Sequence, residues 1–160
     1  MDTNICIFLK NRKSPQVLEK LKERIYAGIY ISSTTVAELQ FGVYNSDYVE
    51  KNKISLLQFL TPFYILNFDD NDAEQFGKIR SKLKKQGKII GSYDMLIASQ
   101  ALSKKLILVT NNTGEFSRIK NLKIEDWTQK EKHTQAKRKR NIYHGNKKVY
   151  ECLFHGGKIK

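Results

Sequence analysis

The chain alternates short runs of β-branched and aromatic residues with longer amphipathic stretches, and this alternation constrains its fold most strongly. The runs that predict strands are residues 29–32 (IYIS), 63–68 (FYILNF), 106–110 (LILVT) and 122–127 (LKIEDW). The stretches between them carry apolar residues at helical spacing. Strands that are joined through helices pair in parallel, with right-handed crossovers. The sequence therefore predicts an α/β fold with a mostly parallel central sheet and helices on both faces.

Start and stop signals place the helices. Ser14 is the expected N-cap of a first amphipathic helix, with Pro15 at its first position and Gly28 after its end. Ser33 or Thr34 is expected to cap the helix that follows the first strand. Further helices are expected at residues 4–10, 47–60, 70–86 and 92–105.

The amino-acid composition changes after Trp127 and divides the chain into two parts. Residues 1–127 hold 19 basic and 14 acidic residues, or +5, whereas residues 128–160 hold 10 basic and 2 acidic residues, or +8. We interpret residues 1–127 as one domain with its own core and residues 128–160 as a basic extension, disordered or weakly structured. The total net charge of +13 favours a polyanionic partner such as nucleic acid, although a solvated surface explains it equally well.

The composition argues against membrane, secreted and zinc-binding classes. No apolar run approaches the roughly 18 residues of a membrane span, and residues 5–9 are too short for a secretory signal. Cys6 and Cys152 are expected to be reduced thiols. Cys152 and His155 form the one pair with zinc-like spacing, which is too few ligands for a site. We expect a cytoplasmic protein without membrane attachment.

Three acidic residues fall next to the ends of predicted strands. Glu38 lies in the helix after the first strand, Asp94 in the helix before the third strand, and Glu115 just past the third strand. Sites in parallel α/β proteins form at the carboxyl ends of strands, where Asp2 would join them if it ended a strand. Each acid alone is as readily a helix cap or a surface residue. Together they would repel one another unless a cation such as Mg²⁺ or Mn²⁺ bound between them.

Five blocks of residues follow one another in an order and spacing typical of one family. They are DTN (2–4), SSTTVAELQFG (32–42), GSYDMLIASQA (91–101), LVTNNTGEFSRI (108–119) and LKIEDW (122–127). Together they resemble the PIN-domain ribonucleases, and more closely the VapC toxins of type II toxin–antitoxin systems. The resemblance is collinear, covers residues 2–127 and implies a PIN-like three-layer α/β/α fold with a mostly parallel central sheet.

The resemblance implies a function as well as a fold. It implies a Mg²⁺-dependent endoribonuclease toxin, with Mn²⁺ as an alternative cofactor, that hydrolyses RNA phosphodiesters by metal-activated water and leaves a 5′-phosphate. Relatives with the TNN sequence cut structured RNA, so tRNA is the expected substrate. The implied partners are a cognate antitoxin and a second copy in a homodimer. Apolar residues of the early helices are candidates for these contacts, although they also suit a core: Phe41, Val43, Tyr44 and Tyr48.

By position, the resemblance assigns four acids to one catalytic and metal-binding site. Asp2 and Asp94 would be the principal metal ligands, and Glu38 and Glu115 would complete the acidic group. The implied supporting residues are Asn4, Thr110 and Asn112.

Basic and aromatic side chains near the acids are candidates for contacts to RNA phosphates and bases. They are Lys10, Lys82, Lys84, Lys85, Lys88 and Tyr93. Ordinary surface lysines fit the same pattern.

The amino end departs from the family. Relatives carry a run of apolar residues before the first acid, which forms the central strand, whereas only Met1 precedes Asp2 here. We therefore expect that first strand to be truncated, so that the strands at 29–32 and 106–110 lack a shared neighbour. This motivates an alternative function: a catalytically impaired toxin remnant that binds antitoxin or RNA without cleaving. A DNA-directed nuclease of the same fold is a more distant third.

Overall fold

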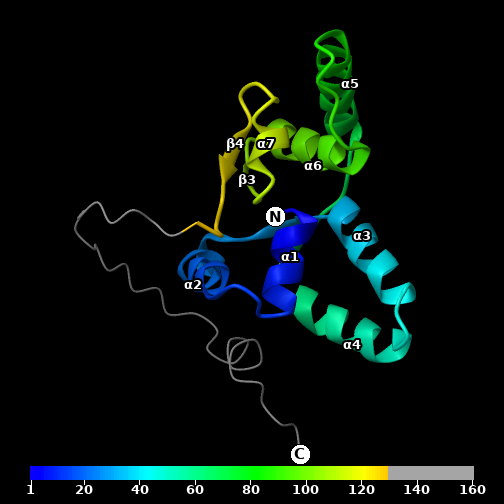
Figure 1. Ribbon diagram of the computed structural model, residues 1–160, viewed down its shortest axis with the longest axis vertical. Coiled ribbons are helices and arrows are strands. Elements are labelled where there is room, and N and C mark those ends of the chain that lie inside the picture. The colour runs from blue at the N-terminus through cyan, green and yellow to red at the C-terminus, as the bar shows by residue number, and fades with distance from the viewer. Residues whose placement is uncertain (130–160) are drawn as a thin grey trace, which may run out of the picture.

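The predicted strands form two parallel pairs in a computed structural model that describes residues 1–129 (Figure 1). β1 (Tyr30–Ser32) pairs with β2 (Tyr64–Leu66), and β3 (Ile107–Val109) pairs with β4 (Lys123–Glu125). Helices connect the two strands of each pair. The parallel α/β fold is thus as predicted, but the sheet is divided between β1 and β3.

The helices follow the predicted order. Their bounds are α1 Thr3–Lys10, α2 Pro15–Arg24, a 3₁₀ turn η1 Ile25–Ala27, α3 Ser33–Tyr44, α4 Val49–Leu60, α5 Asp70–Lys85, α6 Ser92–Ser103 and α7 Thr113–Phe116. Helix α7 has no counterpart among the sequence expectations, because so short a helix shows no periodicity. The basic extension, apart from its first two residues, lies outside the described residues, as do Cys152 and His155.

Helix caps agree with the sequence signals except at α3. The Oγ of Ser14 accepts a hydrogen bond from the Val17 amide at 3.4 Å, as expected for the N-cap of α2. The cap of α3 is Ser32, whose Oγ accepts from the Thr34 amide at 3.1 Å. Strand β1 passes directly into α3, so its last residue serves as the cap one position before the predicted Ser33. This tight junction fixes where α3 begins and thereby places Glu38.

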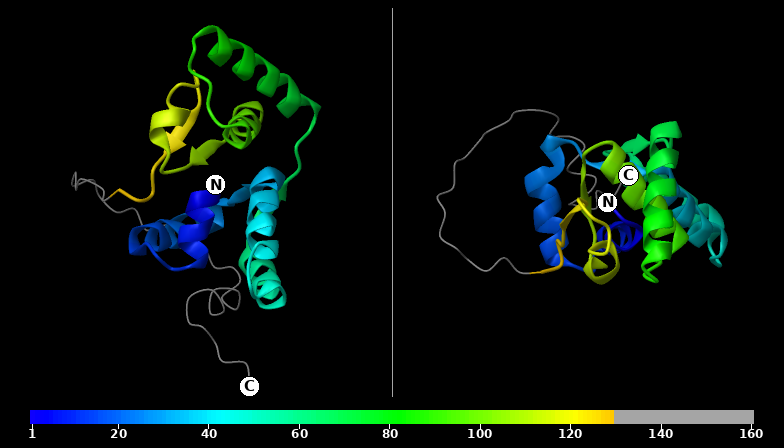
Figure 2. Two further views of the ribbon diagram at one scale, coloured as in Figure 1. Left: turned by 45° about the vertical axis from the view of Figure 1, so that its right-hand side comes forward. Right: turned by 90° about the horizontal axis from the view of Figure 1, so that it is seen from above.

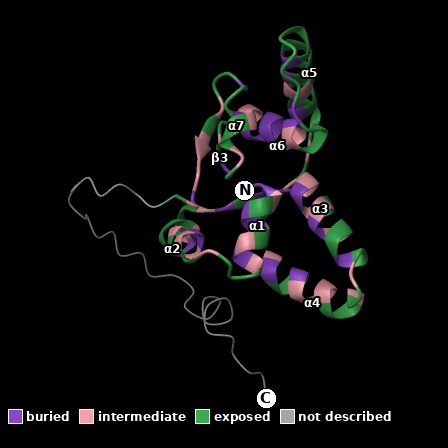
Figure 3. Ribbon diagram, in the orientation of Figure 1, coloured by how far each residue is buried: buried purple, intermediate pink, exposed green. Residues whose placement is uncertain are grey.

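Buried apolar residues gather in two clusters on either side of the amino end. The first joins helices α1–α4 to β1 and includes Ile5, Ile31 and Leu56. The second joins α5, α6 and α7 to β3 and includes Leu83 and Phe116. Helix α6 is buried along much of its length, whereas much of α5 is exposed (Figure 3). Among residues 1–129, no helix is long and apolar enough to cross a membrane.

Residues Met1 and Asp2 bridge the two sheets. The Met1 nitrogen donates to the Tyr30 carbonyl oxygen on β1 at 2.9 Å, and the Asp2 amide donates to the Val109 carbonyl oxygen on β3 at 3.0 Å. The amino end therefore lies between the two halves of the molecule (Figure 2).

A buried ionic network fixes α5 against α6. The fully buried Asp72 carboxylate accepts from Lys104 Nζ at 2.9 and 3.0 Å, from Gln100 Nε2 at 3.4 Å and from the Ser103 hydroxyl. Burial raises the pKa of Asp72, but the hydrogen bonds from Ser103 and Lys104 outweigh it and hold that pKa below its usual value. Because α6 also carries Asp94, this network helps to position the candidate site.

Candidate active site

Asp2 is held by several contacts, although only one residue precedes it. Its Oδ1 caps α1 by accepting from the Ile5 amide at 2.9 Å, and its Oδ2 accepts from the Thr110 hydroxyl. The residue is 4% exposed. Burial raises the pKa of Asp2, and the hydrogen bonds from Thr110 and Ile5 partly oppose that rise. The end of β3 and the start of α1 therefore fix this carboxylate.

Asp94 lies in the first turn of α6 and is partly exposed. The Asn112 side-chain amide donates to its Oδ2 at 3.4 Å. Its pKa is raised to about 6, first by burial, next by the charge of Glu115 and a shared hydrogen bond, and further by Asp2 and Glu38. The other three predicted acids therefore lie close enough to Asp94 for their charges to raise its pKa.

Helix α7 carries Glu115 to Asp94. The next residue, Phe116, is fully buried in the second core cluster and anchors this short helix. Just before α7, the backbone amide of Asn112 donates to the Thr110 hydroxyl oxygen at 2.9 Å. Thr110 and Asn112 thus each contact a predicted acid, as expected of supporting residues, and they are also bonded to each other.

Thr3, rather than Asn4, supports an acid at the amino end. The Thr3 hydroxyl donates to Glu38 Oε2, which joins α1 to α3. Asn4 is exposed, and its supporting role stays a prediction. Successive residues of an α-helix point about 100° apart, so only one of two neighbours can face α3. The signal in the sequence that could have indicated the role of Thr3 is a hydroxyl residue directly after Asp2, the acidic N-cap of α1.

The carboxylates form a coupled but open group. Among residues 1–129, no three acidic, histidine or cysteine side chains lie close enough to enclose a metal ion by themselves. A Mg²⁺ ion uses one or two carboxylates and keeps water and phosphate oxygens as its other ligands. Hard carboxylate oxygens that raise one another's pKa are therefore a donor set that fits Mg²⁺ without a closed cage.

The candidate RNA contacts are mostly exposed. Lys84, Lys85 and Lys88 are exposed at the end of α5 and in the turn that follows, whereas Lys10 is partly buried. Tyr93 is 57% exposed and directly precedes Asp94 in α6. A shallow hollow on α5 is lined by Gly77, Lys78, Ser81, Lys82, Lys85 and Gln86, which adds Lys78 to the basic residues that the sequence singled out.

Exposed apolar residues gather on α3, on α4 and in the turn between them. Phe41 and Tyr48 are each 70% exposed and Tyr44 is 64% exposed. Val43 is only 4% exposed, so it belongs to the core and not to this surface. We call the exposed set the α3–α4 surface, and its members are Phe41, Tyr44, Tyr48, Ile54 and Leu57.

Comparison with known proteins identifies the family of this chain. The PIN domain family matches residues 1–122. The chain is similar to Ribonuclease VapC2 of Haemophilus influenzae, with 41% identity over 128 residues that cover 79% of this chain and 96% of the relative. It is also similar to the tRNA(fMet)-specific endonuclease VapC of Shigella flexneri, with 39% identity over 128 residues, 80% of this chain and 96% of that relative.

Solved structures agree as well. The fold is similar to that in the crystal structure of VapBC2 from Rickettsia felis bound to a DNA fragment from its promoter, with a TM-score of 0.75 and 39% identity over 79% of this chain and 96% of that chain. DNA-bound VapBC from Salmonella typhimurium gives a TM-score of 0.75 and 37% identity over 79% of this chain and 95% of that chain. The chain therefore belongs to the PIN-domain family and, within it, to the VapC ribonucleases.

Proposed function

We propose that the protein is a Mg²⁺-dependent endoribonuclease toxin whose acidic centre consists of Asp2, Glu38, Asp94 and Glu115. The observation that carries this proposal is the pKa of Asp94, which burial and the other three carboxylates raise to about 6. Acids that destabilise one another in this way have a cation as their natural partner. The names of the relatives, which are ribonucleases, support RNA as the substrate class.

The residues of the chain prepare the site for its cation. When bound, Mg²⁺ or Mn²⁺ would supply the activation of water and offset the charge that develops on the phosphodiester oxygens. Asp2 and Asp94 would hold the ion. Thr110 fixes the orientation of Asp2 and Asn112 that of Asp94, so neither carboxylate has to reorganise on binding.

We propose structured RNA, with tRNA as the first candidate, as the substrate in the cytoplasm. The similarity to an endonuclease named for tRNA(fMet) supports this choice. Lys84, Lys85 and Lys88 are exposed and available to phosphates, and the exposed Tyr93 offers a ring for base stacking beside Asp94.

We propose a cognate antitoxin as the protein partner and a homodimer as the assembly. The structural relatives are VapBC toxin–antitoxin complexes. The α3–α4 surface supports the proposal, because a cluster of exposed aromatic residues is typical of a protein interface.

The test is cleavage of tRNA by purified protein freed of antitoxin, with Mg²⁺, with Mn²⁺ or with EDTA. We expect cleavage only with a divalent ion, 5′-phosphate ends, and a loss of at least about 100-fold in Asp94→Asn. Asp47→Asn is the matched control, because Asp47 is an exposed acid outside the site.

Four outcomes would contradict the proposal. Cleavage in EDTA or full activity in Asp94→Asn would exclude the metal site. Equal cleavage of DNA would exclude RNA specificity. RNA or antitoxin binding without any cleavage would favour the catalytically impaired alternative.

A further inference from the structure

The hollow on helix α5, which we call the α5 hollow, is basic and faces solvent. Its lining residues are all exposed: Gly77, Lys78, Ser81, Lys82, Lys85 and Gln86. On the opposite side of the helix, Ile79 and Leu83 are buried in the second core cluster, a division that Figure 3 shows along α5. None of the four acids of the candidate active site lines the α5 hollow, so it is a separate feature.

Helical spacing gathers the lysines of the hollow beside two small residues. Lys78, Lys82 and Lys85 follow one another at steps of four and three residues, which places them on one side of α5. Gly77 and Ser81 are four residues apart and form the neighbouring row. The lysine row extends over about 10 Å, because each residue of an α-helix rises about 1.5 Å. It is therefore long enough to meet more than one charged group of an extended ligand.

The positive charge of the hollow is only partly balanced. Lys78 forms an ion pair with Glu74 at 2.7 Å, one turn earlier on α5. Within residues 1–129, no carboxylate forms an ion pair with Lys82 or Lys85. Residues 75–93 hold six basic residues and no acid. The helix dipole favours cations in the last turn only, and Lys78 lies before that turn, so the dipole does not account for the whole row.

Gly77 keeps the hollow open at a cost in helix stability. A glycine within a helix is less favourable than an alanine. A Cβ atom at Gly77 would meet no other atom within 4 Å, so close packing does not require glycine at this position. The missing side chain lets another molecule approach the helix backbone closely.

The chemistry of the hollow fits a polyanion better than a protein or a membrane. The lining holds no apolar side chain beyond glycine, whereas the centre of a protein interface is rich in aromatic residues. A helix that lies on a membrane turns its apolar face to the lipid, but the apolar face of α5 packs in the core. Lysines beside small polar residues are typical contacts of a phosphate backbone.

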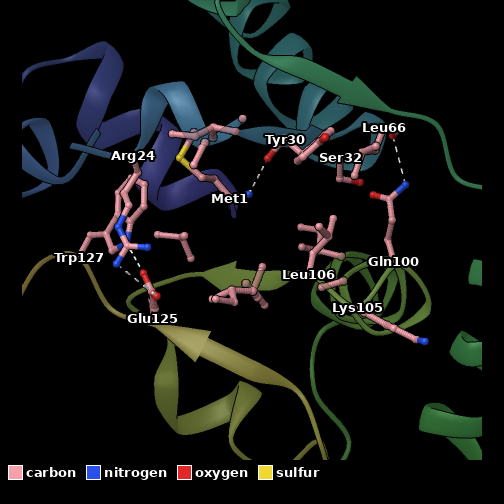
Figure 4. A pocket seen from close by; sticks show the side chains of 18 residues that line it. Met1, Arg24, Tyr30, Ser32, Leu66, Gln100, Lys105, Leu106, Glu125 and Trp127 are labelled. Carbon is pink, nitrogen blue, oxygen red and sulfur yellow. Dashed lines mark hydrogen bonds and ion pairs between the residues drawn. The ribbon is translucent and has the colours of Figure 1, made fainter. Parts of the chain in front are cut away.

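The cavity between the two strand pairs has a different chemistry (Figure 4). Its volume is about 350 Å³ and its lining is mostly apolar. Two basic residues line it, Arg24 and Lys105, and Arg24 is paired with Glu125 at 3.9 Å. This cavity therefore lacks the row of cationic side chains that distinguishes the α5 hollow.

The α5 hollow extends along the half of its helix that is nearer to Asp94. The carboxylate of Asp72, near the start of α5, bonds to Ser103 and Lys104 at the end of α6. The two helices therefore run in opposite directions, and residues 86–91 connect them. The end of α5 thus lies beside the start of α6, which carries Asp94. A nucleic acid bound at the acidic centre can continue over the α5 hollow.

We infer that the α5 hollow binds the phosphodiester backbone of substrate RNA outside the acidic centre. The ammonium groups of Lys78, Lys82 and Lys85 contact neighbouring phosphates, and Gly77 and Ser81 let the backbone approach the helix. Phosphate contacts position a nucleic acid without reading its sequence. The hollow therefore favours RNA that is long enough to reach α5 from the acidic centre. The choice of RNA as the polyanion rests on the proposed function.

The test measures binding of a tRNA transcript in EDTA, where no cleavage is expected. The hollow variant carries Lys78→Gln, Lys82→Gln and Lys85→Gln. The matched control loses the same charge at three exposed lysines outside the hollow, by Lys13→Gln, Lys51→Gln and Lys123→Gln. We expect the hollow variant to raise Kd at least about tenfold at about 100 mM salt and to lower the salt slope of log Kd by about 2. The control should change Kd less than about threefold.

A second pair of variants changes the shape of the hollow without changing its charge. Gly77→Leu fills the hollow, whereas Ala73→Leu places the same side chain at an exposed position one turn earlier, outside the lining. Gly77→Leu should not lower Tm, because a Cβ atom there meets nothing within 4 Å. We expect Gly77→Leu to weaken tRNA binding at least about threefold and Ala73→Leu to leave it unchanged.

Two results would overturn the inference. Equal weakening by the hollow variant and its control would mean that only net charge matters. Unchanged tRNA binding by the hollow variant would mean that RNA does not use this surface. In that case, loss of binding to the cognate antitoxin or to phosphatidylglycerol vesicles would show which other partner does.

The outcome can be told apart from that of the proposed function, because binding is measured without cleavage. A protein that binds tRNA through the α5 hollow but never cleaves it would support this site and contradict the ribonuclease activity. Cleavage of tRNA with unchanged binding by the hollow variant would do the reverse.

Discussion

Replacing Asp94 by Asn is expected to stabilise the metal-free protein while it abolishes cleavage. The carboxylate lies among Asp2, Glu38 and Glu115, and burial and these charges raise its pKa from 3.8 to about 6. The Asn amide keeps the shape of the side chain and an oxygen that can accept from Asn112. The substitution therefore removes a repelling charge without opening a cavity.

The size of the effect follows from the pKa. A rise from 3.8 to about 6 corresponds to at most about 3 kcal/mol, at about 1.4 kcal/mol per pKa unit. Asp94 is partly exposed, and solvent screening reduces this to about 1–1.5 kcal/mol. A raised folded-state pKa means that stability is highest below the unfolded-state pKa and is lost as pH rises through about 6. The gain in free energy of unfolding from Asp94→Asn is thus near zero at pH 4 and reaches its full size above pH 7.

The assay is urea unfolding in EDTA, followed by the fluorescence of the single, buried Trp127. Asp47→Asn, at an exposed acid, should change the free energy of unfolding by less than about 0.5 kcal/mol at either pH. Added Mg²⁺ should stabilise the wild-type chain and have little effect on Asp94→Asn. The reasoning would be refuted if Asp94→Asn were no more stable than wild type at pH 7.5. It would also be refuted if the gain in free energy of unfolding were as large at pH 4 as at pH 7.5.

Other predictions concern the buried residues and the surface of the domain. Asp72→Ala should lower the free energy of unfolding by about 3 kcal/mol in urea titrations, because it removes the buried carboxylate to which Ser103 and Lys104 donate, whereas the exposed Asp70→Ala should cost under about 1 kcal/mol. Phe41→Ser should weaken binding of the cognate antitoxin at least about tenfold in calorimetry without changing Tm; equal weakening by Ile89→Ser, also exposed, would refute a specific surface. Cys6 is fully buried and burial raises its pKa to about 12, so peptide mapping should find it unalkylated by iodoacetamide until urea unfolds the chain; rapid native labelling would contradict that burial.

The fold was predictable wherever local signals agree with packing. The β-branched runs and cap residues predict the four strands and the six longer helices because period and cap chemistry act within a few residues. Helix α7 could not be predicted from such local signals, because Phe116, which anchors it, contacts a core assembled from distant segments. The four strands form two separate parallel pairs, β1 with β2 and β3 with β4.

The candidate site was predictable in its acids and less so in their supports. The strand ends bring Asp2, Glu38, Asp94 and Glu115 within electrostatic reach, as their positions beside those ends imply. Which neighbour faces an acid depends on helix rotation, which the sequence alone does not settle. That is why Thr3 rather than Asn4 bonds to Glu38.

The same limit applies to the α3–α4 surface. Three apolar residues near the end of α3 look equivalent in the sequence, yet they divide between surface and core. Phe41 and Tyr44 are exposed, whereas Val43 is buried. The helix face that packs against α4 decides this, and it is known only once both helices are placed.

The most direct test of a single metal-dependent centre is a double-mutant cycle on tRNA cleavage between Glu38→Gln and Asp94→Asn. The two residues lie on different helices and are coupled through their charges. If both serve one cation, the double variant should be no slower than the slower single variant. Rate losses that multiply in the double variant would show that the two carboxylates act independently, and would contradict a shared centre.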